Sequence, residues 1–245
     1  MDEACPIEGQ EVARILGVGM AFVTFVARAR DGSLSVCKRV RLAAMGDEAK
    51  MQLVREAEAL ARLDGHGAPR LLQSGEDDFG FFVSMELVRG RRVASFDDAR
   101  AAFEALVAVH ERGVVHGDVS PSNLIVGEAR AWLVDFCSAT RRSLDFNGTI
   151  AFTAPERARG EDIDERADVF SMAATIISGA TGVSPRSFGD MPQGAQLVLA
   201  GEKPLDDAFI ALAPPFLRDC LAFGRDMRPR GAAGVLTRLS CLQQA

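Results

Sequence analysis

The chain has 245 residues and a net charge of −6, with 48% hydrophobic and 25% charged residues. A chain of this size and composition can bury a core and fold throughout without disulfides or a structural metal. The acidic balance and the absence of a basic run argue against nucleic acid and anionic membranes as partners. Five cysteines at irregular spacing predict reduced thiols, with neither zinc nor disulfide bonds.

The N-terminal sequence lacks the basic start and apolar run of a secretory signal, and no later stretch stays apolar for about eighteen residues. We therefore expect a soluble, intracellular protein located in the cytoplasm. The sequence does not distinguish a protein that acts in its own cell from one that is delivered into another.

The first part of the chain contains short β-rich runs separated by glycines. These runs fall within residues 12–41 and 70–88, which predicts a meander of β-hairpins. Between them, Leu53, Ala57 and Leu60 recur at the spacing of one helix face, which predicts an amphipathic helix packed on the sheet.

The pattern becomes helical after a boundary that we expect near residues 86–90. A helix should end near Gly113, and residues 166–180 and 208–223 are predicted to be helical as well. The chain has no repeat of fixed period, which excludes a solenoid.

The strongest local signal is a pair of segments that carry two acids and an amide. Asp118 and Asn123 lie in the segment 116–123, and Asp135 follows a short hairpin. Each residue alone is typical of a turn or a cap, but their joint spacing allows all three to converge on one pocket. Magnesium prefers such oxygen ligands together with phosphate, and phosphoryl transfer needs an acceptor for the nucleophile's proton. The segments therefore predict a magnesium-dependent phosphoryl-transfer site.

These segments resemble the catalytic-loop and metal-binding motifs of the protein kinase family almost position for position. The resemblance covers about residues 12–238 and is to a minimal kinase of the serine/threonine type. It implies an α+β, bilobal protein-kinase-like fold, with a small β-rich N-lobe carrying one main helix and a larger, mainly helical C-lobe. We expect one kinase domain over 1–245, with the N-lobe at about 10–85, the hinge at about 86–90 and the C-lobe at about 91–240.

The resemblance also implies an activity, the ATP- and Mg²⁺-dependent transfer of a γ-phosphoryl group to a serine or threonine of a protein substrate. We expect the enzyme to act as a monomer. Asp118 would orient the substrate hydroxyl and accept its proton. Asn123 would hold one magnesium ion, and Asp135 would chelate the metal that bridges the phosphates.

Lysine is rare in this chain and occurs only as Lys38, Lys50 and Lys203. By the resemblance, Lys38 would reach the α- and β-phosphates and pair with Glu56. Strand alternation puts Val36 on the same face as Lys38, where it would cover the adenine. The alternative is an exposed lysine and a solvated helical glutamate.

Further nucleotide contacts are implied by a glycine-rich segment and by the hinge. Glycines let backbone amides approach phosphate. At the hinge, backbone groups of Glu86 and Val88 would contact the adenine edge, and Met85 would limit the back pocket. The expected nucleotide-binding residues are Leu16, Gly17, Gly19, Val36, Lys38, Met85, Glu86, Val88, Ile125 and Asp135.

Residues 148–156 match the segment that seats the acceptor peptide in serine/threonine kinases. In terms of the family, Glu156 would pair with Arg228, and Asp168 would brace the backbone of the catalytic loop. Removing one partner of such a buried ion pair would destabilise the fold by about 3–5 kcal/mol.

Four positions depart from the family pattern. Gly117 replaces the arginine that holds a phosphorylated activation loop, so loop phosphorylation should not be required. Ser120 replaces the lysine that steadies the γ-phosphate, which predicts slower turnover. Cys137 replaces the glycine after Asp135-Phe136, and Phe22 replaces the third glycine of the glycine-rich segment.

Two alternatives to a protein kinase stay open. A pseudokinase would keep the fold and bind a nucleotide or a partner without catalysis, as the four departures suggest. A small-molecule phosphotransferase would share only the core motifs, whereas the segment 148–156, Asp168 and Arg228 are peculiar to protein kinases. The retained set of Lys38, Glu56 and the three catalytic-loop and metal residues favours catalysis.

Overall fold

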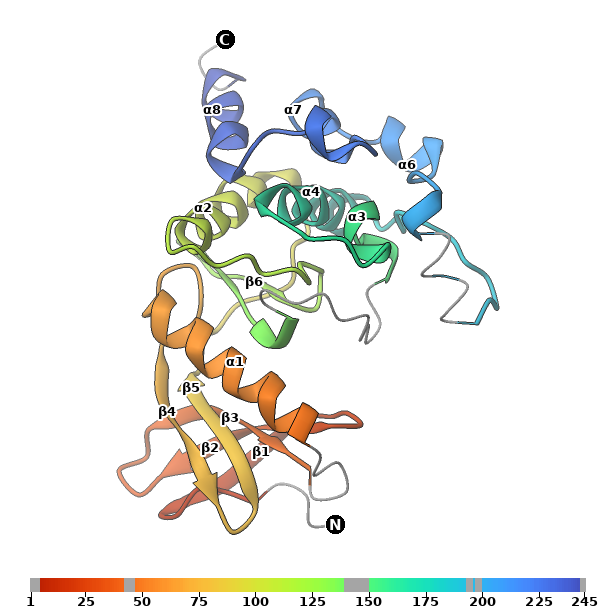
Figure 1. Cartoon of the computed structure of the whole chain (residues 1–245). Coiled ribbons are helices and arrows are strands. Elements are labelled where there is room, and N and C mark those ends of the chain that lie inside the picture. The colour runs from red at the N-terminus through yellow and green to blue at the C-terminus, as the bar shows by residue number, and fades with distance from the viewer. Residues whose placement is uncertain (1–4, 42–46, 139–149, 193–195, 197–199, 243–245) are drawn as a thin grey trace. The chain divides into compact units, whose positions relative to one another are not determined.

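A computed structural model describes residues 5–41, 47–138, 150–192, 196 and 200–242 (Figure 1). The chain divides into two compact units, Met1–Val88 and Arg89–Ala245. Unit 1 is β-rich with one long helix, and unit 2 is mainly helical, which confirms the expected α+β fold class.

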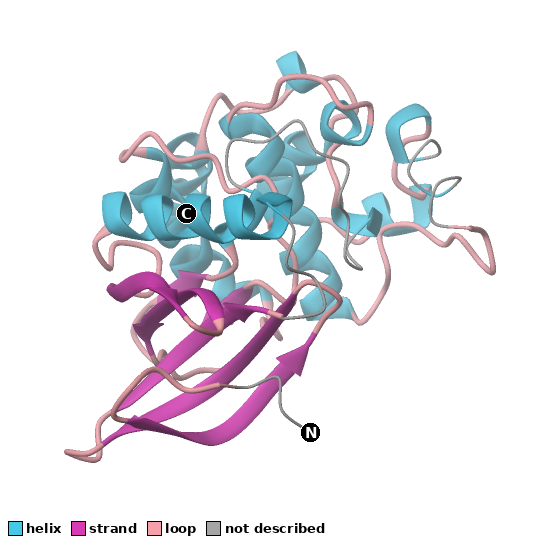
Figure 2. Cartoon of the chain, turned by 60° about the horizontal axis from the view of Figure 1, so that its bottom comes forward, coloured by secondary structure: helices cyan, strands magenta, loops and turns pink. Residues whose placement is uncertain are grey.

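The described residues of unit 1 form one antiparallel sheet of five strands in the order β1-β2-β3-β5-β4. Figure 2 shows the strands of the chain in magenta. The order differs from a simple meander, because β5 returns beside β3 and leaves β4 at the edge. The helix that follows β3 provides the long connection that makes this order possible. The strands are β1 Gln10–Val18, β2 Phe22–Ala29, β3 Leu34–Val40, β4 Leu71–Asp77 and β5 Gly80–Glu86.

The helix α1, Asp47–Leu63, packs against β3, β4 and β5. Its predicted apolar stripe is confirmed, since Leu53, Ala57 and Leu60 are all buried. Asp47 and Glu48 lie in its first turn, where negative charge stabilises the helix dipole.

The other face of the sheet has its own core, which includes Cys37 of β3 and Ile7 from the segment before β1. Burial raises the pKa of the Cys37 thiol to about 12, so this thiol stays protonated. Arg39 is 1% exposed and donates to both carboxylate oxygens of Asp77. Strand β3 is therefore enclosed on both faces, which fixes the position of Lys38 between Cys37 and Arg39.

Unit 2 is built around α4, Glu165–Thr181, whose residues Ala167–Ile177 are buried without a break. Burial on all sides is typical of a helix at the centre of a core. The N-cap Asp164 accepts a hydrogen bond from the Arg166 amide, and Gly182 ends the helix in a left-handed conformation. The predicted helix over 166–180 is confirmed.

The helices Ala99–His110 (α2) and Ala232–Leu242 (α8) pack against α4, and a two-stranded hairpin follows the loop 116–123. The regular elements of the described part of unit 2 also include α2 Ala99–His110, β6 Leu124–Val126, β7 Ala131–Leu133, α3 Pro155–Ala158, α6 Asp207–Ala211, α7 Pro215–Arg218 and α8 Ala232–Leu242. The 3₁₀ turns are η2 Phe96–Asp98, η3 Phe136–Ser138, η4 Ile150–Phe152, η5 Asp219–Leu221 and η6 Arg225–Met227. Among the described residues, no helix combines the length and apolarity needed to cross a membrane.

The single helix predicted over 208–223 is wrong. The structure has α6, α7 and η5 in its place. The cause is the Pro214-Pro215 pair, because a proline has no amide hydrogen to donate and its ring excludes the preceding turn. Pro215 instead begins α7 at a position where a missing amide hydrogen costs nothing.

Candidate active site

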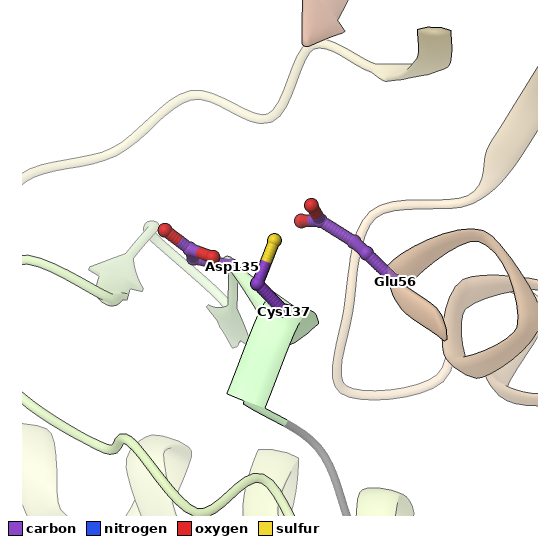
Figure 3. A group of neighbouring side chains, drawn as sticks. All are labelled: Glu56, Asp135 and Cys137. Carbon is purple, nitrogen blue, oxygen red and sulfur yellow. The ribbon is translucent and has the colours of Figure 1, made fainter. Parts of the chain in front are cut away.

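A buried ion pair joins β3 to α1 in unit 1. Lys38 Nζ lies 3.0 Å from Glu56 Oε2, and their side chains are 8% and 1% exposed. Glu56 projects from α1, as Figure 3 shows. The Lys38 ammonium also lies 5.0 Å from the centroid of the Phe22 ring, a cation–π distance. Two neighbours within unit 1 therefore hold the ammonium group that was predicted to reach phosphate.

The glycine-rich segment forms the end of β1 and the turn into β2. The Gly19 amide donates to Phe22 O at 2.8 Å, and Gly19 O accepts from Arg41 Nη1 at 2.5 Å. Leu16 is 45% exposed, and no atom lies within 4 Å of a side-chain carbon built on Gly17. A phosphate could approach Gly17 freely, but the amide of Gly19 already bonds within the turn.

The predicted hinge begins at the end of β5. Met85 is buried and lies opposite Val36, which places the two expected adenine neighbours side by side. The Glu86 amide donates to Arg70 O at 2.9 Å. Val88 is half-buried and makes no backbone hydrogen bond with any residue that the structure describes. Its backbone is thus available to a ligand, because partly buried peptide groups otherwise find partners.

In unit 2, the loop 116–123, which was predicted to be the catalytic loop and is given that name below, holds Asp118 and Asn123 in direct contact. Asn123 Nδ2 donates to Asp118 O at 2.9 Å and to Asp118 Oδ2 at 3.2 Å. Both donor hydrogens of the amide are used in this way. Asn123 Oδ1 accepts no hydrogen bond from the described residues, so it can serve as a metal ligand.

His116 ties the catalytic loop to the residue that precedes Asp135. The Asp118 amide donates to His116 Nδ1 at 3.1 Å, which requires the imidazole proton on Nε2. His116 Nε2 then donates to Val134 O at 3.0 Å, and the Val134 amide donates to Asn123 O at 2.9 Å. Asp135 therefore starts from a backbone that is fixed to the same loop as Asp118 and Asn123.

Asp135 has a left-handed backbone, with φ of 66°. Aspartate tolerates this conformation better than most residues, and the turn it makes sends Phe136 into the core. The Phe136 ring is fully buried, 4.6 Å from the centroid of His116. Cys137 is the second residue of the turn η3 (Figure 3), and its sulfur lies within 4.8 Å of an Asp135 carboxylate oxygen. The thiol that replaces the family's glycine is thus adjacent to a predicted metal ligand.

Asp168 of α4 braces the catalytic loop, as predicted. Its carboxylate accepts from the amides of His116 and Gly117, both at 2.7 Å, and from His110 Nε2 at 3.0 Å. Gly117 has φ of 76°, which glycine adopts without strain and which turns both amides toward Asp168. Burial alone would raise the pKa of Asp168, but the hydrogen bonds from His110 and from the Gly117 amide keep the pKa below its ordinary value.

The predicted Glu156–Arg228 ion pair is also confirmed. The guanidinium donates to Glu156 Oε1 at 2.7 Å and to Oε2 at 3.0 Å, with both side chains almost fully buried. Within the predicted acceptor-peptide segment, the structure describes residues 150–156, whereas Thr149 and Ser143 lie outside the described residues.

Three residues of this region were missed by sequence reasoning. Arg186 is buried and donates to the carbonyls of Ala151 and Thr153 at 2.9 and 3.0 Å. Burial lowers the pKa of Arg157, although the charges of Asp118 and Asp168 oppose the shift. His110, the third, was treated only as a helix marker. Arginines that bond backbone carbonyls leave no spacing pattern, so no signal in the sequence could have identified Arg186.

The donor set of the catalytic loop fits a divalent cation of the magnesium type. A carboxylate at Asp135 and an amide oxygen at Asn123 are hard oxygen ligands, and magnesium binds through one or two carboxylates plus phosphate oxygens. The Asn123 oxygen that accepts no other hydrogen bond is the structural observation that supports this fit.

A β-rich unit with a buried lysine–glutamate pair and a helical unit with a braced aspartate–asparagine loop define the class of bilobal phosphotransferases. The protein kinase domain model matches residues 10–202. The chain therefore belongs to the protein kinase family.

Curated relatives carry the same family name. The chain is 29% identical over 209 residues to serine/threonine-protein kinase PknJ of Mycobacterium tuberculosis, covering 74% of this chain and 35% of the relative. It is 32% identical over 212 residues to the DNA damage-responsive serine/threonine-protein kinase RqkA of Deinococcus radiodurans, covering 75% and 31%. It is 29% identical over 222 residues to serine/threonine-protein kinase PknL of Mycobacterium tuberculosis, covering 74% of this chain and 55% of the relative. The chain thus spans about a third to about half the length of these relatives.

Proposed function

We propose that this protein is an ATP- and Mg²⁺-dependent serine/threonine protein kinase in which units 1 and 2 serve as the N-lobe and C-lobe of one monomeric kinase domain. The observation that carries the proposal is the hydrogen bond between Asn123 Nδ2 and Asp118 Oδ2 at 3.2 Å. It places a carboxylate that can accept a proton beside an amide whose other end can hold a metal. The acceptor is the hydroxyl of a serine or threonine in a protein substrate.

Each residue of the catalytic loop has a separate task. ATP with its magnesium supplies the phosphoryl group and neutralises the phosphate charge. Asp118 orients the substrate hydroxyl and accepts its proton, and Asn123 fixes that carboxylate through Nδ2. Asn123 Oδ1 and Asp135 are the residues that would hold the metal. The brace from Asp168 keeps the loop in one conformation, which lowers the entropic cost of aligning the hydroxyl.

The nucleotide would be held from unit 1. Lys38, oriented by Glu56 and Phe22, would donate to the α- and β-phosphates. Val36 and Met85 would cover the adenine, and the free backbone of Val88 and the carbonyl of Glu86 would contact its edge. The other predicted nucleotide contact, Ile125, lies on β6 of unit 2. Because the Gly19 amide bonds within its own turn, we expect the phosphates to depend more on Lys38 than on Leu16, Gly17 and Gly19.

Activation-loop phosphorylation should not be required, since Gly117 offers no guanidinium to a phosphorylated loop. Replacing both Ser143 and Thr149 by alanine should leave transfer within about twofold of the wild type. A loss of more than about tenfold, with an unchanged melting temperature, would contradict this part of the proposal.

The function is tested by transfer of labelled phosphate from magnesium-ATP to a generic protein acceptor. Wild type should label the protein, while Asp118→Asn should reduce labelling by about 100-fold or more, because the proton acceptor is lost. Asp118→Asn should still bind nucleotide, which at about 100 times its dissociation constant stabilises the fold by about 2.7 kcal/mol. Asp135→Asn should lose both labelling and the magnesium-dependent part of that stabilisation.

The outcomes separate the alternatives. Equal labelling by wild type, Asp118→Asn and Asp135→Asn would refute the enzymatic proposal. A nucleotide-dependent stabilisation without any transfer would indicate a pseudokinase, which the substitutions at Phe22, Ser120 and Cys137 would then explain. Label that appears on small alcohols offered in parallel, but not on protein, would indicate a small-molecule phosphotransferase.

A further inference from the structure

The segment before α2 carries three arginines, Arg89, Arg91 and Arg92, and the structure holds its backbone against β6. The Arg91 amide donates to Val126 O at 2.9 Å, and the Val126 amide donates to Arg91 O at 2.8 Å. At the preceding residue, Gly90, an added side-chain carbon would lie 2.4 Å from Val126 O, so only glycine permits this approach. β6 directly follows the catalytic loop, and the segment therefore lies beside that loop.

The two neighbouring arginines, Arg91 and Arg92, differ in their partners. Arg91 donates to both carboxylate oxygens of Asp98, each at 2.7 Å, so its charge is balanced. Arg92 turns toward the catalytic loop, where its Nη1 donates to Pro121 O at 2.5 Å. Among the described residues, Arg92 has no carboxylate partner, and its side chain is exposed. The charge of Arg92 is therefore available to another molecule.

The position of Arg92 is defined on both sides of the residue. Arg91 is fixed by the backbone bridge to Val126, and Val93, which is 5% exposed, is anchored in the core. The contact with Pro121 fixes the side chain as well, three residues after Asp118 and two before Asn123. An exposed guanidinium that is ordered in this way loses less entropy on binding an anion than a freely rotating one.

Because Pro121 accepts from Arg92 and lies three residues after Asp118 in the same loop, a protein chain that presents its hydroxyl to Asp118 would pass near Arg92. The next exposed residue of the loop is Ser122, which carries no charge. Among the described residues of this loop and of the segment before α2, the exposed charge beside Pro121 is therefore positive, although the whole chain has a net charge of −6. A positive charge attracts carboxylates and repels lysine and arginine.

We propose that Arg92 is a specificity-determining residue that selects protein substrates with aspartate or glutamate close to the acceptor serine or threonine. This inference rests on the proposed function, because it takes Asp118 as the marker of the acceptor position. Arg91 contributes to specificity only by fixing the backbone, since its own charge is taken by Asp98.

The test uses the full chain and peptides of equal length that contain one threonine. In one series, three glutamates precede the threonine; in a second, they follow it; matched peptides carry glutamine or lysine at the same positions. Wild type should show kcat/KM about threefold to fivefold higher for a glutamate peptide than for its glutamine match, as expected for an exposed charge pair. The preference should shrink between low and high salt.

Three variants assign the preference to Arg92. Arg92→Ala should reduce the glutamate preference to less than about twofold while leaving the glutamine peptide unchanged, and Arg92→Glu should favour the lysine peptide. Arg89→Ala is the matched control. It removes an exposed arginine three positions earlier that has no partner among the described residues and does not contact the catalytic loop, so it should keep the preference.

Several outcomes would overturn the inference while leaving the kinase intact. One is wild-type transfer without a preference for glutamate. Another is an equal loss for all peptides in Arg92→Ala together with a higher KM for ATP, which would assign Arg92 to the nucleotide. If wild type transfers phosphate neither to a peptide nor to the generic protein acceptor, the proposed function fails instead. Binding of a fluorescein-labelled glutamate peptide then decides the inference: tighter binding than the glutamine match, lost in Arg92→Ala, supports it, and equal binding contradicts it.

Discussion

The catalytic loop of unit 2 and the β1–β2 turn of unit 1 are held in opposite ways. The loop backbone bonds to Asp168, a carboxylate at the centre of the core, and its side chains bond one another. The turn is held by one internal bond at Gly19 and by Arg41, and most of β1 is exposed. The residues proposed for chemistry are thus fixed by buried groups, whereas the residues proposed to cover phosphate are held by the β1–β2 strand pairing and a few surface contacts. Substitutions should therefore cost more stability in the loop region than in the turn.

The largest effect is expected from Asp168→Ala. Two buried amides and His110 lose their acceptor, and each unsatisfied buried donor costs about 1–3 kcal/mol, so the free energy of unfolding should fall by about 4 kcal/mol. Urea unfolding measures the change, with Asp190→Ala at an exposed site as the control. If Asp168→Ala does not fold, Asp168→Asn, which keeps one acceptor oxygen, should fold with a smaller loss. A loss below about 1 kcal/mol for Asp168→Ala would contradict the comparison.

A smaller effect with a defined pH dependence is expected from Asp98→Asn, at the start of α2. The hydrogen bonds from Arg91, together with those from the Ala94 and Ser95 amides, lower the pKa of Asp98 to about 2. Because the pKa is lower in the folded state, the carboxylate stabilises the fold at pH values above its ordinary pKa of 3.8. This contribution disappears as the pH falls toward 2. Because Arg91 is 57% exposed, solvent screens the ion pair. We therefore expect Asp98→Asn to lower the free energy of unfolding by about 1–2 kcal/mol at pH 7.

Unfolding of wild type and Asp98→Asn should be compared at pH 7, 4 and 3. The difference in the free energy of unfolding should be complete at pH 7 and should shrink between pH 4 and 3. A difference that stays constant over this range would mean that the carboxylate charge does not contribute.

The smallest effect is expected in unit 1, from Phe22→Leu. The substitution keeps an apolar side chain but removes the ring beside Lys38, a contact worth about 0.5–1 kcal/mol. The KM for ATP should rise about twofold to fivefold, with little change in the melting temperature. Phe79→Leu is the control, because the Phe79 ring lies near Arg39 and not near Lys38. A fall in KM would show that the ring competes with phosphate for the ammonium group.

The sequence predicted the features of this molecule that have a period or a fixed motif spacing. The buried stripe of α1, the helix α4, the Asp168 brace and the Glu156–Arg228 pair all agree with the structure. The family motifs also indicated Lys38 and Glu56 as a pair, and the two side chains are in contact. Local periodicity and motif order are sufficient for such features.

Features that depend on distant or unpatterned partners could not be predicted. The place of β5 between β3 and β4 depends on a long connection, and the break in the helix predicted over 208–223 depends on two prolines that outweigh the apolar pattern. Arg186 bonds only backbone carbonyls, which any sequence provides. The different partners of Arg91 and Arg92 could not be predicted either, because they depend on which of the two neighbouring side chains binds Asp98.

The close approach of Gly90 to Val126 has a consequence for engineering. Because main-chain atoms and Val93 locate residue 92, its side chain can be exchanged while the surrounding backbone stays in place. If Arg92 has the proposed role, position 92 is suited to altering substrate preference, whereas any residue larger than glycine at position 90 would displace both this segment and the strand β6 that carries Ile125.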